Sequence, residues 1–215
     1  MRNIYILLVA VVGSILPCGL VRGDPTFSYY VNQPNYDVLP NQSVQVPVLI
    51  REAVTDPDVS LLVAEDGLFS AGVLLQRTNS SLSQPVIITG ASANVTDFDD
   101  FLATIIVTDD ESSIFEMRDM AHFSGVLADE TFPGSGVRDT LLGTFTFTAG
   151  ANIGEITTFQ LTDNTTDDTL TWMNLTLLDP DIYSTSFTVT VVPEPTSILL
   201  CITGLFTTVL KWRRL

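Results

Sequence analysis

Residues 143–149 read GTFTFTA and residues 185–191 read TSFTVTV. In both stretches apolar side chains alternate with Ser or Thr, and this period of two is typical of a strand with one buried face and one wet face. Thr and aromatic residues also suit a pleated sheet. These stretches therefore predict a β fold.

The same pattern extends outward along the chain. Residues 43–50, SVQVPVLI, alternate in the same way, and residues 29–40, YYVNQPNYDVLP, predict an opening edge strand that is broken at Pro34. Further candidate strands lie at 72–78, 103–108, 157–162 and 169–177. Turn-forming residues separate them at 56–58, 65–67, 133–136 and 179–181. Many short strands divided in this way predict an all-β fold, a single antiparallel β-sandwich of eight or nine strands.

One segment fits two structures. In residues 111–121, ESSIFEMRDMA, a helix would place Ile114, Met117 and Ala121 on one face, and Ser113 with Glu116 has the spacing of a capping box. A strand with a bulge fits these residues equally well, so both alternatives stay open.

The N-terminal residues resemble an export signal. Arg2 precedes an apolar run over residues 4–16, and small or polar residues follow as far as Gly23. This order predicts a secretory signal peptide over residues 1–23 and an exported domain over residues 24–192. Cys18 and Cys201 both lie outside that domain, so we expect it to contain no disulfide, zinc–thiolate site or cysteine nucleophile.

The predicted domain is strongly acidic. It contains all of the acidic residues except Glu194 but only four basic ones, which gives it a formal charge of −20. A surface of this sign repels phosphate backbones, so the composition argues against nucleic acid as a partner.

The C-terminal segment has three parts. Pro193-Glu194-Pro195 is followed by an uncharged run over residues 196–210 and then by a basic segment, residues 211–215, with Lys211, Arg213 and Arg214. As a helix the run would span about 22 Å, less than the roughly 30 Å of a hydrocarbon core. The pattern predicts a short transmembrane helix over 196–210, with the basic tail in the cytoplasm and the domain outside.

These three parts, in this order, resemble the PEP-CTERM sorting signal of Gram-negative bacteria. The resemblance implies that an exosortase, a membrane-embedded cysteine peptidase-transferase, is the partner of the motif at residues 193–195. It also implies a role alongside exopolysaccharide and biofilm systems. The two prolines keep the backbone extended for such an enzyme, and Glu194 supplies a single charge. The alternative is an ordinary single-pass anchor.

A second resemblance concerns the domain itself. Residues 46–54, 61–77, 141–150 and 187–195, with LLGTFTFTAG as the most characteristic piece, are similar to the cohesin-like domains that often precede this signal. The resemblance implies a jelly-roll β-sandwich. It does not identify a dockerin-binding face.

No catalytic site is predicted. His122 is the only histidine, and no Gly-x-Ser-x-Gly motif is present. Carboxylate pairs are abundant, so a polysaccharide-active enzyme that uses two acidic residues is the rival prediction.

Acidic loop clusters suggest at most a structural metal. Loop carboxylates are the usual ligands of calcium, and Asp163, Asp167 and Asp168 form the candidate site, although a solvated acidic surface explains them as well. No other cofactor is expected. Trp172 is predicted to lie in the core, and a sugar-binding face could draw on four tyrosines, namely Tyr29, Tyr30, Tyr36 and Tyr183.

Taken together, the sequence predicts an exported, non-catalytic surface or extracellular-matrix protein. We expect it to be held for a time in the inner membrane and then moved to the cell surface or matrix, where its domain acts as an adhesive or scaffold linked to exopolysaccharide.

Overall fold

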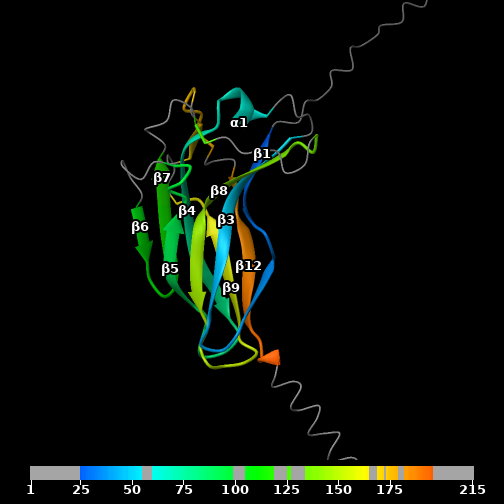
Figure 1. Ribbon diagram of the computed structural model, residues 1–215, viewed down its shortest axis with the longest axis vertical. Helices are drawn as coiled ribbons and strands as arrows, with labels where there is room; N and C mark the ends of the chain where they lie inside the picture. Colours follow the sequence, from blue (N-terminus) through cyan, green and yellow to red (C-terminus); the bar gives the residue numbers. More distant parts are fainter. Residues whose placement is uncertain are drawn as a thin grey trace, which may run out of the picture.

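The fold consists almost wholly of β-strands, which form two sheets packed face to face (Figure 1). The computed structural model describes residues 25–54, 60–98, 105–118, 125–126, 134–164, 169–171, 173–178 and 182–195. The all-β prediction is therefore confirmed for the described part of the chain.

The first sheet has the strand order β11-β1-β3-β8-β5. Its strands are β1 (Thr26–Val31), β3 (Ser43–Ala53), β5 (Ile87–Ala93), β8 (Val137–Thr148) and β11 (Ile182–Tyr183). The second sheet has the order β2-β12-β9-β4-β7-β6, and β10 also pairs with β4. Its strands are β2 (Asn35–Val38), β4 (Leu68–Ser80), β6 (Ile105–Thr108), β7 (Ser112–Arg118), β9 (Ile156–Thr162), β10 (Leu170–Thr171) and β12 (Thr185–Val191).

Two details differ from the sequence prediction. Within the described residues there are twelve strands rather than eight or nine. The strands β10 and β11 have only two residues each, and β5 shows no strict alternation of buried and exposed residues, so none of these gave a clear period. The sheets are also mixed rather than wholly antiparallel, since β1–β11 and β2–β12 pair in parallel. The predicted break at Pro34 explains the second parallel pair: the chain passes there from β1 in one sheet to β2 in the other.

The ambiguous segment is a strand over Ser112–Arg118, and Ala121 lies outside the described residues. This strand, β7, pairs with β4 on one side and β6 on the other. Its backbone donors and acceptors are thereby used on both edges, and this pairing prevails over the local helix signal.

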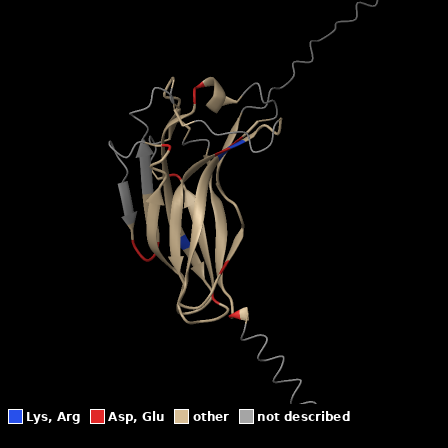
Figure 2. Ribbon diagram, in the orientation of Figure 1, with Lys and Arg blue, Asp and Glu red and all other residues tan. Residues whose placement is uncertain are grey.

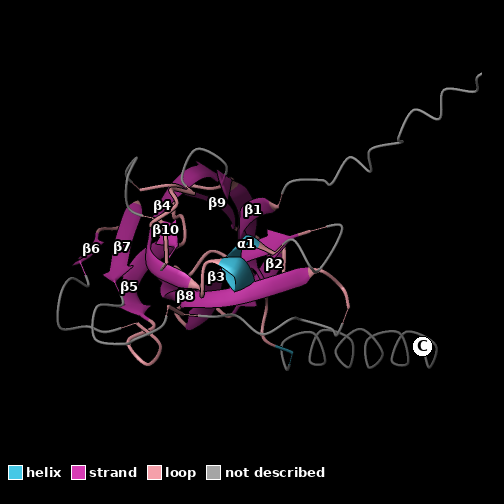
Figure 3. Cartoon of the chain, turned by 90° about the horizontal axis from the view of Figure 1, so that it is seen from above, coloured by secondary structure: helices cyan, strands magenta, loops and turns pink. Residues whose placement is uncertain are grey.

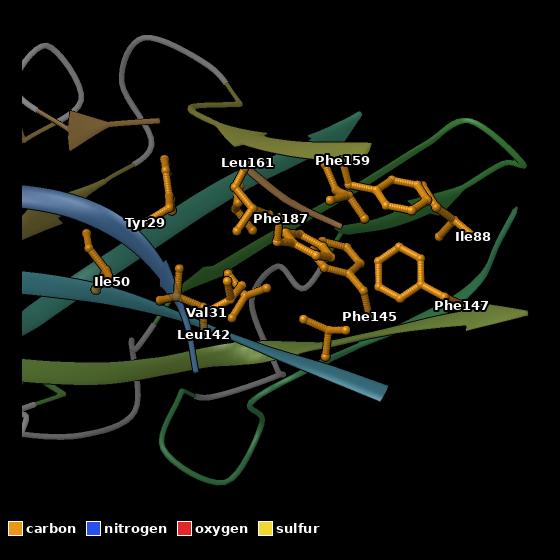
Figure 4. Packing of buried hydrophobic residues seen from close by; sticks show 14 of the residues in the cluster. Tyr29, Val31, Ile50, Ile88, Leu142, Phe145, Phe147, Phe159, Leu161 and Phe187 are labelled. Atoms are coloured by element: carbon orange, nitrogen blue, oxygen red, sulfur yellow. The ribbon is translucent and has the colours of Figure 1, made fainter. Parts of the chain in front are cut away.

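The two stretches that carry the strongest alternation build the centre of the core (Figure 4). Phe147 of β8 in the first sheet packs against Phe159 of β9 and Phe187 of β12 in the second, with ring centroids 4.6 Å and 5.7 Å apart. Phe159 and Phe187 are themselves 5.8 Å apart. All three rings are buried, so the alternating Phe and Val residues join the sheets while the Thr residues face outward.

The domain has two distinct ends. At one end the short helix α1 (Leu61–Ala64) lies over the sheets, as the view from above shows (Figure 3). We call this the α1 end. β12 runs away from it and the described chain finishes at the opposite end, which we call the exit end (Figure 1). Three loops meet there, residues 39–42, 81–86 and 149–155. Within the described ranges, no helix is long and apolar enough to cross a membrane.

Candidate functional site

The Pro-Glu-Pro motif begins directly where the second sheet ends. β12 is an interior strand, between β2 and β9. Val191 N donates to Glu155 O at 2.9 Å, and Val192 N donates to Val38 O at 2.9 Å. Pro193, the next residue, is half-buried and has no N–H to continue the pairing.

The rest of the motif is accessible. Glu194 and Pro195 are exposed at the exit end, so a sorting enzyme would meet them two and three residues beyond Val192, the last residue bonded to the sheet. The basic residues Lys211, Arg213 and Arg214 lie outside the described residues, as does the predicted helix over 196–210.

The candidate calcium ligands are not brought together by any described contact. Asp163 follows β9 at the α1 end, while Asp167 and Asp168 lie outside the described residues. Within the described ranges, no three acidic, histidine or cysteine side chains are placed to share a metal ion. The calcium site stays a prediction.

Another acidic cluster has a structural role. In the β6–β7 turn, Asp109 Oδ1 accepts hydrogen bonds from the backbone N–H of Glu111 at 2.8 Å and of Ser112 at 2.5 Å. These donors, together with the Ser112 hydroxyl, lower the pKa of Asp109. This carboxylate therefore closes a tight turn.

Buried carboxylates order the α1 end. Glu52, at the end of β3, is fully buried and accepts hydrogen bonds from Ser60 Oγ at 2.6 Å, Leu61 N at 2.6 Å and Leu62 N at 3.2 Å. It holds the first turn of α1 against the first sheet. The sequence contained a signal for this residue, because Glu52 continues the inward register of Val46, Val48 and Ile50.

Glu65, just after α1, fixes a hairpin that is distant in the sequence. Its carboxylate accepts hydrogen bonds from the backbone N–H of Asn174 at 3.0 Å, on Oε2, and from Asn174 Nδ2 at 2.8 Å, on Oε1. Its main-chain carbonyl accepts one from Met173 N at 2.9 Å. Glu65 is itself only 9% exposed. Thr171 Oγ1 also donates to Oε2 at 3.5 Å, so four hydrogen bonds attach the hairpin to Glu65.

We call the anchored segment, residues 169–178, the distal hairpin. It is closed by hydrogen bonds from Thr171 N to Thr176 O at 3.1 Å and from Leu178 N to Thr169 O at 3.0 Å. β10 lies within it and pairs with β4. Trp172 falls outside the described residues, so its predicted place in the core is not tested.

The distal hairpin presents apolar side chains to solvent. Met173 is 63% exposed and Leu175 54% exposed, and Leu177 is exposed as well. Leu175 also has a φ of +52°, a left-handed conformation that costs a residue with a Cβ about 1–2 kcal/mol. An exposed Leu in a strained, anchored turn is typical of a contact surface.

The four tyrosines divide between the core and one outer face. Tyr29 and Tyr36 are buried, and Tyr29 Oη donates to Gly72 O at 2.7 Å. Tyr183 is exposed on β11, opposite Ser28 of β1, and Tyr30 faces outward on β1. The outer face of the first sheet therefore holds two of the four candidates on neighbouring strands.

A planar charged group covers Tyr30. The Arg51 guanidinium carbon lies 3.4 Å from the Tyr30 ring centroid, and Asp139 accepts hydrogen bonds from Arg51 Nε at 2.6 Å and Nη2 at 2.7 Å. The Asp139 carboxylate raises the pKa of Arg51. This bidentate pair fixes a flat surface of a tyrosine, a guanidinium and a carboxylate, in a chain where basic residues are rare (Figure 2).

Comparison with known proteins gives no family assignment. No family model matches the chain, and no curated protein matches it. A solved structure described as AvmM, which catalyses macrocyclization in alchivemycin A biosynthesis, aligns with 80% of this chain and 90% of that one, at 6% identity and a TM-score of 0.25. A similarity this low supports no inference about fold or activity.

Proposed function

We propose that the chain is an exported, non-catalytic surface or matrix protein of the PEP-CTERM kind, whose domain is a jelly-roll or cohesin-like β-sandwich. The observation that carries the proposal is the position of Pro193-Glu194-Pro195. The motif follows β12 after a single residue, Val192, at the end of the domain opposite the distal hairpin. A domain held through residues 196–215 would therefore direct the hairpin away from the membrane.

The adhesive part of the proposal rests on two surfaces. Met173, Leu175 and Leu177 give the distal hairpin an apolar tip that would contact another surface protein or the matrix. Tyr183, exposed on the outer face of the first sheet, is an aromatic group available to stack on the sugars of an exopolysaccharide, and it lies near Tyr30, whose ring is covered by Arg51. The buried acids Glu52 and Glu65 are assigned to positioning loops rather than to acid–base chemistry.

The experiment that tests the sorting step is mass spectrometry of the C-terminal peptide in cell-surface and medium fractions. We expect a C-terminus near residues 190–196, bare or with an added group. A tail intact through Leu215 and found only in the membrane fraction would instead show a permanent single-pass anchor. The matched control is Pro193→Ala with Glu194→Ala, which should leave the tail intact if an exosortase reads the motif.

The alternative function, a polysaccharide-active enzyme that uses two acidic residues, predicts a different result. Hydrolysis of an exopolysaccharide by the purified chain, abolished by replacing a single Asp or Glu, would establish a glycan-active enzyme and overturn the non-catalytic assignment.

A further inference from the structure

The loops at the exit end of the domain lack charge, although Glu194 of the motif and Asp37 of β2 are exposed beside them. These loops are residues 39–42, 81–86 and 149–154, which, together with Ile156 at the start of β9, we call the exit collar. They contain no Asp, Glu, Lys or Arg. Glu155, which follows directly, is fully buried and accepts hydrogen bonds through Oε1 from Ser80 Oγ at 2.9 Å and Ser81 N at 3.1 Å. The exit collar therefore presents a neutral surface.

The collar is also apolar and tied together. Ile153 and Leu82 are 55% and 47% exposed, and Ile156, the first residue of β9, is 45% exposed. Asn41 N donates to Gly150 O at 3.2 Å, which joins the first loop to the third. Ser81 N donates to Ile156 O at 3.0 Å, which joins the second loop to β9. The exposed apolar residues are thus part of the ordered end of the two sheets.

The collar surrounds the point where the chain leaves the domain. Gly154 N donates to Val191 O at 2.8 Å, so Ile153 stands beside the last residues of β12. Only Pro193, Glu194 and Pro195 separate Val192 from the uncharged run that begins at Thr196. Four fully extended steps from Val192 to Thr196 cover at most about 14 Å.

This reach brings the collar to the lipid surface. The headgroup layer on each side of a bilayer is about 5–8 Å thick. If the run enters the hydrocarbon at Thr196, Val192 therefore lies at most about 6–9 Å above the headgroups. An exposed apolar surface without charge is what the interface between headgroups and acyl chains accommodates.

The nearest acidic loop does not oppose this contact. Asp109, Asp110 and Glu111 also lie toward the exit end, but Glu111 O accepts a hydrogen bond from Arg77 N, three residues before the end of β4 at Ser80. Three strand residues correspond to about 10 Å, so this loop is set back from the tip of the collar, although Asp110 O accepts a hydrogen bond from Ile88 N at 3.4 Å, two residues after loop 81–86. Glu111 also pairs with Arg77 at 2.5 Å.

We propose that the exit collar is a membrane-contact surface, on which Leu82, Ile153 and Ile156 rest in the lipid headgroup layer and orient the domain while the tail holds it. The inference rests on the proposed function, in that it requires residues 196–210 to enter the bilayer. It adds that the domain stands upright on a defined surface, with the distal hairpin furthest from the lipid.

The test uses the full chain in vesicles of phosphatidylethanolamine and phosphatidylglycerol. A single cysteine is placed by Ile153→Cys, or independently by Leu82→Cys, in a Cys18→Ser, Cys201→Ser background, and carries an environment-sensitive fluorophore. Met173→Cys, at a residue of the distal hairpin that is 63% exposed, is the control. We expect lipid-borne nitroxide to quench the labels at 153 and 82 strongly and the label at 173 weakly, with the reverse order for aqueous iodide.

The outcomes separate the two proposals. A chain that floats with the vesicles while the labels at 153 and 82 behave like the label at 173 overturns the collar contact and leaves the anchor in place. A chain that does not float with the vesicles overturns both the anchor and the collar contact.

Discussion

The attachment of the distal hairpin by Glu65 can be tested by replacing the donor of one hydrogen bond with an acceptor. Asn174→Asp replaces the Nδ2 donor, 2.8 Å from Glu65 Oε1, with a second carboxylate oxygen. The variant loses a hydrogen bond to a charged group, worth about 1.5–3 kcal/mol. It also places a second negative charge beside the buried Glu65, a repulsion that falls to about 1 kcal/mol when the new Asp side chain turns into water.

Because Asn174 is exposed and its side chain can rotate into water, we expect Asn174→Asp to lower the free energy of unfolding by about 2 kcal/mol. Adding Glu65→Gln to this variant should restore most of the lost free energy of unfolding. The Gln amide then donates to the new Asp carboxylate, and its carbonyl still accepts from the backbone N–H of residue 174. The double variant should therefore be more stable than Asn174→Asp alone.

The assay is denaturant unfolding of the full chain in detergent, combined with hydrogen exchange of residues 169–178. Asn79→Asp, an exposed position in β4, adds the same charge elsewhere and serves as the control. If Asn174→Asp is no less stable than Asn79→Asp, or if Glu65→Gln makes the Asp variant worse, Glu65 does not attach the hairpin as described.

Three further predictions follow from individual residues. Leu175→Gly removes the Cβ penalty at φ +52°, so it should preserve or raise stability, by up to about 1 kcal/mol, while weakening cell-surface or matrix attachment in a pull-down. Phe147→Ala empties the centre of the core and should cost about 3–5 kcal/mol in denaturant unfolding; a cost below 1 kcal/mol would contradict the packing. Asp109→Asn should reduce stability most above about pH 4, because the lowered pKa of Asp109 gives a contribution that is present above its unfolded value and lost as pH falls through its folded value. A stability difference that grows on acidification would contradict this assignment.

The parts of the fold that the sequence predicted are those governed by local periodicity. The alternation in residues 143–149 and 185–191 identified β8 and β12 and the buried ring positions Phe145, Phe147 and Phe187, because a period of two fixes which side chains face the core. The pairing partners of those strands depend on contacts between distant segments. The parallel β2–β12 pair, for example, joins residues more than 150 positions apart and leaves no local pattern.

In the candidate site, too, the sequence predicted local motifs but not contacts between distant segments. Pro193-Glu194-Pro195 was recognisable as a motif, whereas its position one residue after the last sheet hydrogen bond depends on how β12 ends. Glu65 carries no local signal, because its partner Asn174 comes from another loop. Glu52 could have been found, since it occupies an inward position of β3, where an acid requires donors.

The placement of β12 has a mechanical consequence. A tether attached beyond Val192 and a contact at the distal hairpin would pull on the domain from opposite ends, roughly along the strands. β12 is held by β9 on one side and β2 on the other, so tension on the tail loads both rows of hydrogen bonds together in shear instead of opening them one at a time. The domain should therefore unfold slowly under force, a property suited to a linker that carries load between a membrane and a matrix.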